Sequence, residues 1–122
     1  MNGDELRSRS MAFAKRIVGS YQYLCESKRE FILSKQLLRC GTSIGANISE
    51  AQYGSSRRDF LNKLYIALKE AAETMYWLRL LYECGYFSEQ EYTSLNSECD
   101  ELRRILSAIT KSTRDNMMET IK

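Results

Sequence analysis

The sequence of 122 residues contains neither proline nor histidine. Proline is frequent in turns and at the edges of β-sheets, so its absence favours a fold built from long helices. The absence of histidine removes the most common nitrogen ligand for zinc and related metals. Apolar runs are only a few residues long and residues 1–10 lack the apolar segment of a secretory signal, so we expect a cytoplasmic protein without membrane contact.

Cysteine is sparse, with four copies that are widely spaced in the sequence. No two of them lie within four residues of each other, which excludes a C-x-x-C motif for zinc or redox chemistry. In a reducing compartment we interpret them as small residues that pack between helices, with a disulfide or a metal site as the alternatives. The four residues are Cys25, Cys40, Cys84 and Cys99.

What the sequence does contain is a helical spacing of apolar residues. In four segments they recur three or four positions apart, which is typical of amphipathic helices. The length leaves room for one domain, and the short connections indicate that neighbouring helices are antiparallel. The sequence predicts a single all-α domain over 1–122, an antiparallel up-down four-helix bundle with helices at about 4–24, 28–53, 57–84 and 89–112 and a frayed tail at 113–122.

Local capping signals define the ends of these helices. Before the second, third and fourth helices, a serine is followed three residues later by an acidic residue, and such pairs satisfy free backbone N–H groups. Glycine is predicted to stop the second and third helices, because it enters the left-handed region freely. The capping pairs are Ser27–Glu30, Ser56–Asp59 and Ser88–Glu91, and the stops are Gly54 and Gly85.

The third helix has a wider apolar face than a bundle core requires. Beside its core stripe, a second apolar strip follows the same helix. A lone bundle has no need for so wide a face, so the strip indicates contact with a partner. Its members are Leu61, Tyr65, Leu68, Ala72, Tyr76 and Trp77.

Residues 40–49 of the second helix, CGTSIGANIS, are poor helix formers. Their summed propensity costs about 3–4 kcal/mol, yet the apolar register passes through the stretch without interruption. We therefore predict a continuous helix in which Gly41, Gly45 and Ser49, spaced four apart, let another helix approach closely. A phosphate-binding loop is excluded, because Ala46 and Asn47 stand where such a loop has lysine and serine or threonine.

The run GTSIGANISEAQ, from Gly41 to Gln52, resembles the S-I-x-A-N-I-x-E signature of the four-helix-bundle proteins encoded within 23S rRNA intervening sequences. The similarity continues at 59–60, 66–71 and 73–78, and it extends over roughly residues 13–110. One departure is Ala51, where many relatives have glycine.

The resemblance implies an antiparallel four-helix bundle that assembles as a ring-shaped homopentamer. It also implies that no catalytic residue and no cofactor are established for the family. Relatives include the accessory variability proteins of diversity-generating retroelements, which are similar basic barrels that bind a reverse transcriptase and nucleic acid. RNA, DNA and a reverse transcriptase are therefore the partners that the resemblance suggests.

Two pairs of polar residues are candidates for chemistry. Asn47 and Glu50 lie one helical turn apart, but acid–base catalysis needs a second titratable group and a nucleophile, and neither is indicated. Glu70 and Glu73 have the carboxylate spacing of a di-metal bundle, which also requires Glu-x-x-His motifs that are absent here. We expect no enzyme, no cofactor and no metal, and we interpret Asn47 and Glu50 as a structural polar pair.

Positive charge is concentrated in the first part of the chain. Residues 1–69 carry 12 basic and 6 acidic side chains, a balance of +6, whereas residues 70–122 carry 6 basic and 10 acidic ones, a balance of −4. Arg57 and Arg58 occupy a helix start, where the dipole disfavours cations by about 0.3–1 kcal/mol, so helix stability does not explain them. In an up-down bundle one end collects Arg7, Arg9, Arg57, Arg58, Lys111 and Arg114.

These features predict a non-catalytic, homo-oligomeric binding module that contacts nucleic acid or a nucleic-acid enzyme through its basic end. One alternative is that the basic end is only a solvated rim, balanced by nearby acids. Another is a structural scaffold that binds protein and no nucleic acid. Binding to phosphates weakens steeply with salt, whereas a mostly apolar protein contact does not, so salt dependence separates the two functions.

Overall fold

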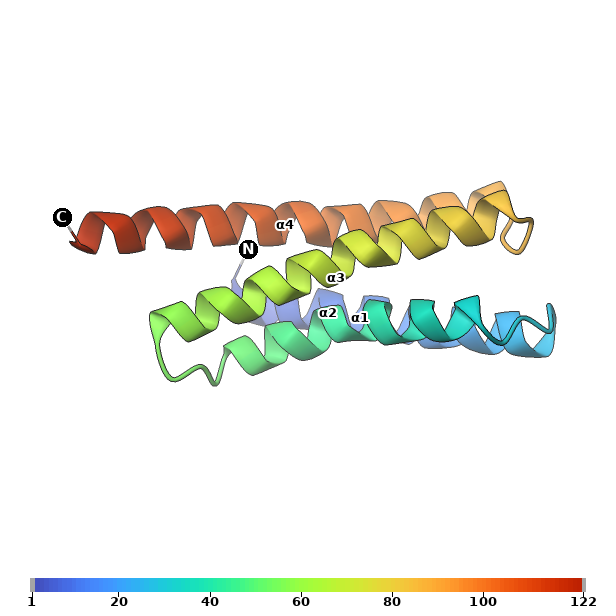
Figure 1. The fold of residues 1–122 in the computed structure, drawn as a ribbon, viewed down its shortest axis with the longest axis horizontal. Coiled ribbons are helices and arrows are strands. Elements are labelled where there is room, and N and C mark those ends of the chain that lie inside the picture. The colour runs from blue at the N-terminus through green and yellow to red at the C-terminus, as the bar shows by residue number, and fades with distance from the viewer. Residues whose placement is uncertain (1, 122) are drawn as a thin grey trace.

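The computed structural model describes residues 2–121, with side chains for residues 2–119. It contains four α-helices and no strand in that range: α1 (Gly3–Glu26), α2 (Leu33–Ala51), α3 (Arg57–Glu83) and α4 (Glu89–Ile121). Successive helices run in opposite directions, so the starts of α1 and α3 and the ends of α2 and α4 lie at one end of the bundle (Figure 1). The prediction of an all-α chain with four helices is confirmed.

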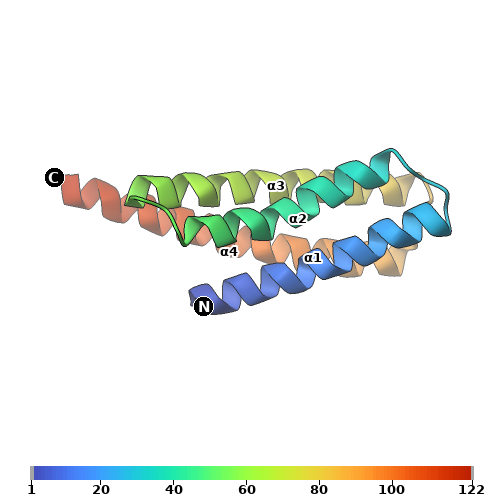
Figure 2. The ribbon, with the colours of Figure 1, turned by 90° about the horizontal axis from the view of Figure 1, so that it is seen from below.

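Each helix packs mainly against its neighbour in the sequence. The contact between α2 and α3 is the most extensive, and that between α1 and α4 is the least. Figure 2 shows α2 between α1 and α3. Among the described residues, no helix is long and apolar enough to cross a membrane. The apolar stripes meet along the bundle axis, where burial of each large side chain contributes about 1.5–3 kcal/mol. Fully buried members include Phe13, Ile17, Leu37, Ile44, Leu64, Leu78, Leu102 and Leu106.

The connection between α1 and α2 differs from the predicted capping box. α1 continues through Glu26, and the backbone N–H of Ser27 donates to the carbonyl oxygen of Tyr23 (2.9 Å). α2 begins at Leu33 and not near residue 28. The predicted Ser27–Glu30 capping box is wrong, because Ser27 ends the first helix and is not free to open the second.

Glu30 nevertheless caps α2, from a position before its first turn. Its carboxylate is buried, and Oε1 accepts hydrogen bonds from the backbone N–H groups of Ile32, Leu33 and Ser34 at 2.7, 2.6 and 3.1 Å. The chain reaches this arrangement through Arg29, which adopts a left-handed conformation with a φ of 54°. One carboxylate thus satisfies several of the N–H groups that a helix start leaves free.

The starts of α3 and α4 follow the sequence signals more closely. The Glu91 N–H donates to Ser88 Oγ (3.1 Å) and the Ser88 N–H donates to the Glu91 carboxylate (3.0 Å), which completes a capping box. At α3, the Asp59 N–H donates to Ser56 Oγ (3.0 Å), but the Asp59 carboxylate accepts from the N–H of Ser55 (3.2 Å). Both predicted helix starts are confirmed.

The two predicted glycine stops behave differently. Gly85 follows α3 with a φ of 85°, which is the left-handed conformation expected there. Gly54 does not adopt a positive φ, and α2 already ends at Ala51. A Cβ at Gly54 would lie 3.1 Å from the backbone nitrogen of Phe60. Glycine at position 54 therefore permits a close approach of the chain, and its predicted role as a left-handed stop is wrong.

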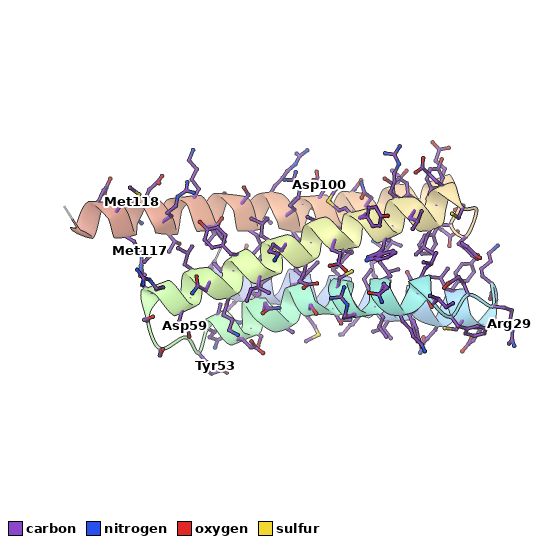
Figure 3. All side chains as sticks on the ribbon, viewed as in Figure 1. Arg29, Tyr53, Asp59, Asp100, Met117 and Met118 are labelled. Carbon is purple, nitrogen blue, oxygen red and sulfur yellow. The ribbon has the colours of Figure 1, made fainter. Side chains whose placement is uncertain are left out.

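α4 continues through Ile121, so the prediction of a frayed tail from residue 113 is wrong. Thr110 and Thr113 are buried, and Met117 is half-buried on the side of α4 that faces the start of α3 (Figure 3). These residues extend the core spacing beyond Leu106. The apolar pattern misses Thr110 and Thr113 because threonine is polar and does not register as a core residue. Residue 122, also part of the predicted tail, lies outside the described residues.

The four cysteines are free and occupy different environments. Cys40 and Cys99 are buried, Cys25 is half-buried and Cys84 is exposed. Burial raises the pKa of the Cys99 thiol to about 12 and that of the Cys40 thiol to about 11. Cys40 and Cys99 therefore pack between helices, as the sequence predicts, whereas Cys84 at the end of α3 does not.

The four cysteines are expected to differ in their rates of alkylation. The thiolate is the reactive form, so burial and raised pKa values should leave Cys40 and Cys99 unmodified by iodoacetamide in the folded protein at about pH 8. Cys84 should react rapidly under the same conditions, and denaturant should make all four reactive. Mass spectrometry of the peptides measures the labelling. Native Cys99 reacting as fast as Cys84 would contradict its place in the core.

Candidate functional site

The basic residues predicted to gather at one end do lie on the helix segments that meet there, at the starts of α1 and α3 and toward the end of α4 (Figure 1). Three of the six form ion pairs, namely Arg7 with Asp4, Arg9 with Glu101 and Arg114 with Asp115. Arg57, Arg58 and Lys111 are exposed and have no ion-pair partner among residues 2–119. The structure thus leaves half of the predicted set free to bind an anion.

Arg9 lies at a different level along the bundle from the unpaired cations of α3 and α4. Arg9 contacts Glu101, and Lys111 follows Glu101 by ten residues of α4, or about 15 Å along the helix axis. Ile109 lines a cavity together with Phe60, so this part of α4 is level with the start of α3. Arg9 is therefore set back from Arg57, Arg58 and Lys111. The paired Arg7, in contrast, lines the same cavity as Phe60 and Ile109, and the paired Arg114 follows Lys111 on α4.

Arg57 and Arg58 are the first two residues of α3. A helix start carries partial positive charge, which opposes cations and favours anions. The next residue, Asp59, uses its carboxylate to accept a hydrogen bond from the Ser55 N–H and does not pair with either guanidinium. Two free guanidinium groups and a helix N-terminus thus lie together, an arrangement suited to phosphate.

The polar residues Asn47 and Glu50 have separate partners. Asn47 donates from Nδ2 to the carbonyl oxygen of Ser43 (2.8 Å). Glu50 lies 2.9 Å from Nζ of Lys63 on α3, and this hydrogen bond raises the pKa of Lys63. No bond joins Asn47 to Glu50 in the described part of the chain. The prediction that these two residues pair with each other is therefore wrong, and Glu50 links α2 to α3.

α2 runs without a break through its glycine-containing stretch, as predicted. A Cβ at Gly41 would lie 2.9 Å from Cγ1 and Cγ2 of Ile17, and one at Gly45 would lie 3.2 Å from Oγ of Ser10. Both glycines thus face α1, and the contact at Gly41 is the tighter one. Ser49 is exposed and lines a groove of about 440 Å³ between α1 and α2, so it is not a close-contact position.

The second apolar strip of α3 divides between core and surface. Leu61 is buried, whereas Tyr65, Leu68 and Trp77 are half-buried and Ala72 and Tyr76 are exposed. Ile66, which lies outside the predicted strip, is also exposed. The outward side of α3 therefore presents apolar side chains to solvent around Ile66 and Tyr76.

The carboxylates of Glu70 and Glu73 form ion pairs with an arginine of α2. Both contact Arg39 of α2, and Glu73 also accepts a hydrogen bond from Nε1 of Trp77 (3.0 Å). Within the part of the chain that the structure describes, no group of three or more side chains is placed to hold a metal ion. Glu70 and Glu73 thus join α2 to α3.

Tyr53 is a candidate that the sequence pattern did not single out. It belongs to the predicted second helix, but α2 ends at Ala51 and the Tyr53 side chain is exposed in the connection to α3 (Figure 3). A signal was present, because the apolar register of α2 ends at Ala51. An aromatic residue between that point and Gly54 has no core position to fill.

Comparison with known proteins places this arrangement in a family. The sequence model of the 23S rRNA-intervening sequence protein family matches residues 5–108. No curated protein matches the chain. The fold is similar to the crystal structure of a protein of unknown function from the S23 ribosomal protein family of Bacteroides thetaiotaomicron VPI-5482, with 49% sequence identity, a TM-score of 0.89, and coverage of 91% of this chain and 99% of that one. The chain belongs to the family of 23S rRNA-intervening sequence proteins.

Proposed function

We propose that this chain is a non-catalytic, homo-oligomeric binding module that contacts RNA or DNA through Arg57, Arg58 and Lys111 at its basic end. The observation that carries the proposal is the pair Arg57 and Arg58, whose exposed side chains have no ion-pair partner among residues 2–119. Phosphate oxygens are suited to two guanidinium groups at a helix start. Lys111 extends the same end, and Arg114 is held only loosely, 3.8 Å from Asp115.

Assembly into a ring would increase the affinity of this small cluster for nucleic acid. In a homopentamer, the assembly that the family resemblance implies, every copy contributes the same cations around one axis. Affinity and salt dependence both grow with the number of phosphates contacted at once. The resemblance also suggests a reverse transcriptase as protein partner, and a shared nucleic acid would bring that enzyme to the ring.

Fluorescence anisotropy of labelled RNA and DNA oligonucleotides tests the proposal. The wild type should bind at low salt, and Arg57→Ala/Arg58→Ala should weaken binding by at least about tenfold, because two charge-assisted contacts are lost. The matched control is Lys28→Ala/Lys35→Ala, which removes the same charge near the opposite end of the bundle. The control should keep the wild-type affinity, and unchanged binding by the arginine variant would contradict the proposed site.

A structural scaffold that binds only protein is the second candidate. The exposed apolar side chains of Ile66 and Tyr76 on the outward side of α3 favour it, because patches of this kind commonly mark protein contacts. Absence of nucleic-acid binding by the wild type at low salt would favour the scaffold and contradict the first proposal.

Self-association is expected at micromolar concentration, with a mass well above the 14.2 kDa of one chain and near that of a pentamer. Ile66→Glu/Tyr76→Glu should reduce this mass, because charge is introduced into the apolar outward side of α3. Val18→Glu is the control, since Val18 on α1 and Ile66 are exposed to a similar extent, 40% and 41%. Light scattering measures the mass, and a wild-type monomer would contradict the expectation.

A further inference from the structure

Tyr53 lies at the outer edge of the α2–α3 connection, with its side chain directed away from the helices (Figure 3). The side chain is 79% exposed. Among the described residues its ring contacts no other ring and no cation, and its hydroxyl makes no hydrogen bond. The ring therefore adds nothing to the core, and its faces are open to solvent.

The backbone that carries Tyr53 has a defined conformation. The Tyr53 N–H donates to the carbonyl oxygen of Glu50 (3.0 Å), and the Gly54 N–H donates to that of Ala51 (3.1 Å). The chain then passes so close to Phe60 that a Cβ at Gly54 would lie 3.1 Å from its backbone nitrogen. Hydrogen bonds to the end of α2 thus fix the backbone that carries the aromatic ring, which limits the backbone entropy lost when a ligand binds.

The same turn leads directly to the unpaired arginines of α3. Arg57 follows Tyr53 by four residues, so their Cα atoms are at most about 14 Å apart. The Ser56 cap fixes the start of α3 and with it the direction in which Arg57 and Arg58 leave the backbone. The exposed Tyr53 and the exposed, unpaired Arg57 and Arg58 therefore belong to one short segment at this edge of the bundle.

We infer that this edge is a binding site for single-stranded nucleic acid, in which Tyr53 stacks on an unpaired base while Arg57 and Arg58 contact the neighbouring phosphates. The inference rests on the proposed function and adds the form of the nucleic acid. Proteins that bind single strands combine aromatic stacking platforms with a cationic path for the backbone. A duplex keeps its bases stacked inside the helix, so Tyr53 has no face to meet there. Recognition is tolerant of sequence, because every base offers a π-face.

The opposite end of the bundle provides a matched aromatic residue whose ring has one face covered. Phe31 is 46% exposed and also stands beside basic residues. The guanidinium of Arg29, however, lies over the Phe31 ring, 5.3 Å from its centroid. This cation–π contact covers a face that a base would need, so Phe31 serves as the control position.

The test compares Tyr53→Ala, Tyr53→Phe and Phe31→Ala with the wild type, using labelled single-stranded RNA and a duplex of the same length. Tyr53→Ala should lose about 5-fold to 150-fold in affinity for the single strand, the range for one stacked base. Its affinity for the duplex and its salt dependence should not change, because no phosphate contact is removed. Tyr53→Phe should keep the wild-type affinity for the single strand, because phenylalanine also offers a ring for stacking. Phe31→Ala should also bind as the wild type does.

The outcomes separate this inference from the proposed function. Full single-strand affinity in Tyr53→Ala, together with weakened binding in Arg57→Ala/Arg58→Ala, overturns the stacking role and leaves the phosphate site standing. Equal losses for the single strand and the duplex also overturn it, because stacking on an unpaired base cannot affect a duplex. No binding by the wild type overturns both. Thermal unfolding of each variant, expected to match the wild type because the substituted side chains are exposed, excludes a folding defect as the cause.

Discussion

Replacing Gly41 with leucine is expected to lower the free energy of unfolding by roughly 1–3 kcal/mol. The added Cβ alone would lie 2.9 Å from two carbons of Ile17. Ile17 is fully buried, and its branched side chain has few alternative rotamers, so it has no room to yield. Even Gly41→Ala should therefore destabilise the fold, although alanine favours a helix by about 1 kcal/mol over glycine.

Gly19→Ala is the matched control for this prediction. Gly19 lies in the interior of α1, and an added Cβ would have no atom of the described residues within 4 Å apart from the nearby backbone of its own helix. This substitution should raise the free energy of unfolding by about 0.5–1 kcal/mol through helix propensity alone. Thermal and urea unfolding of both alanine variants measure the difference. If Gly41→Ala is stabilised as much as Gly19→Ala, the close contact between α1 and α2 is refuted.

Removing the carboxylate of Glu30 is the second change with a large expected effect. Glu30→Ala should lower the free energy of unfolding by about 1–3 kcal/mol, because backbone N–H groups at the start of α2 lose their acceptor. Glu30→Gln keeps an oxygen acceptor without the charge and should lose less. Urea denaturation measures the loss. An unchanged dependence of the free energy of unfolding on urea concentration shows that the compactness of the folded and unfolded states is not altered.

Ser27→Ala distinguishes this cap from the capping box that the sequence suggests. Only the backbone of Ser27 takes part in ending α1, so the substitution should change stability by less than about 0.5 kcal/mol. A true capping box would make the serine hydroxyl as important as the glutamate. A loss in Ser27→Ala equal to that in Glu30→Ala would therefore contradict the structure of this connection.

Most of the fold could be predicted from the sequence because its signals are local. The Ser88–Glu91 capping box and the left-handed Gly85 act within a few residues, so the boundaries of α3 and α4 around them follow directly. The start of α2 could not be predicted in this way. The Glu30 carboxylate reaches the N–H groups of that helix start because Arg29 adopts a left-handed conformation, which residues other than glycine rarely do.

In the candidate site, too, local features could be predicted from the sequence and contacts between distant segments could not. The conflict between Arg57 and the helix dipole is visible in the sequence, and in the structure no side chain of residues 2–119 forms an ion pair with Arg57. Arg9 looks equally free in the sequence, but its partner Glu101 is contributed by the fourth helix and is apparent only after folding. Tyr53 is marked in the sequence only indirectly, because it follows Ala51, where the apolar register of α2 ends; its exposure to solvent is apparent only in the folded chain.

The salt dependence of nucleic-acid affinity tests the central claim most directly. Each phosphate contact to a single strand contributes about −0.7 to the slope of log K against log salt. The slope for Arg57→Ala/Arg58→Ala should therefore be shallower than that of the wild type by at least about 1.4, while Lys28→Ala/Lys35→Ala keeps the wild-type slope. Equal slopes for the wild type and the arginine variant would show that these two residues do not contact phosphate.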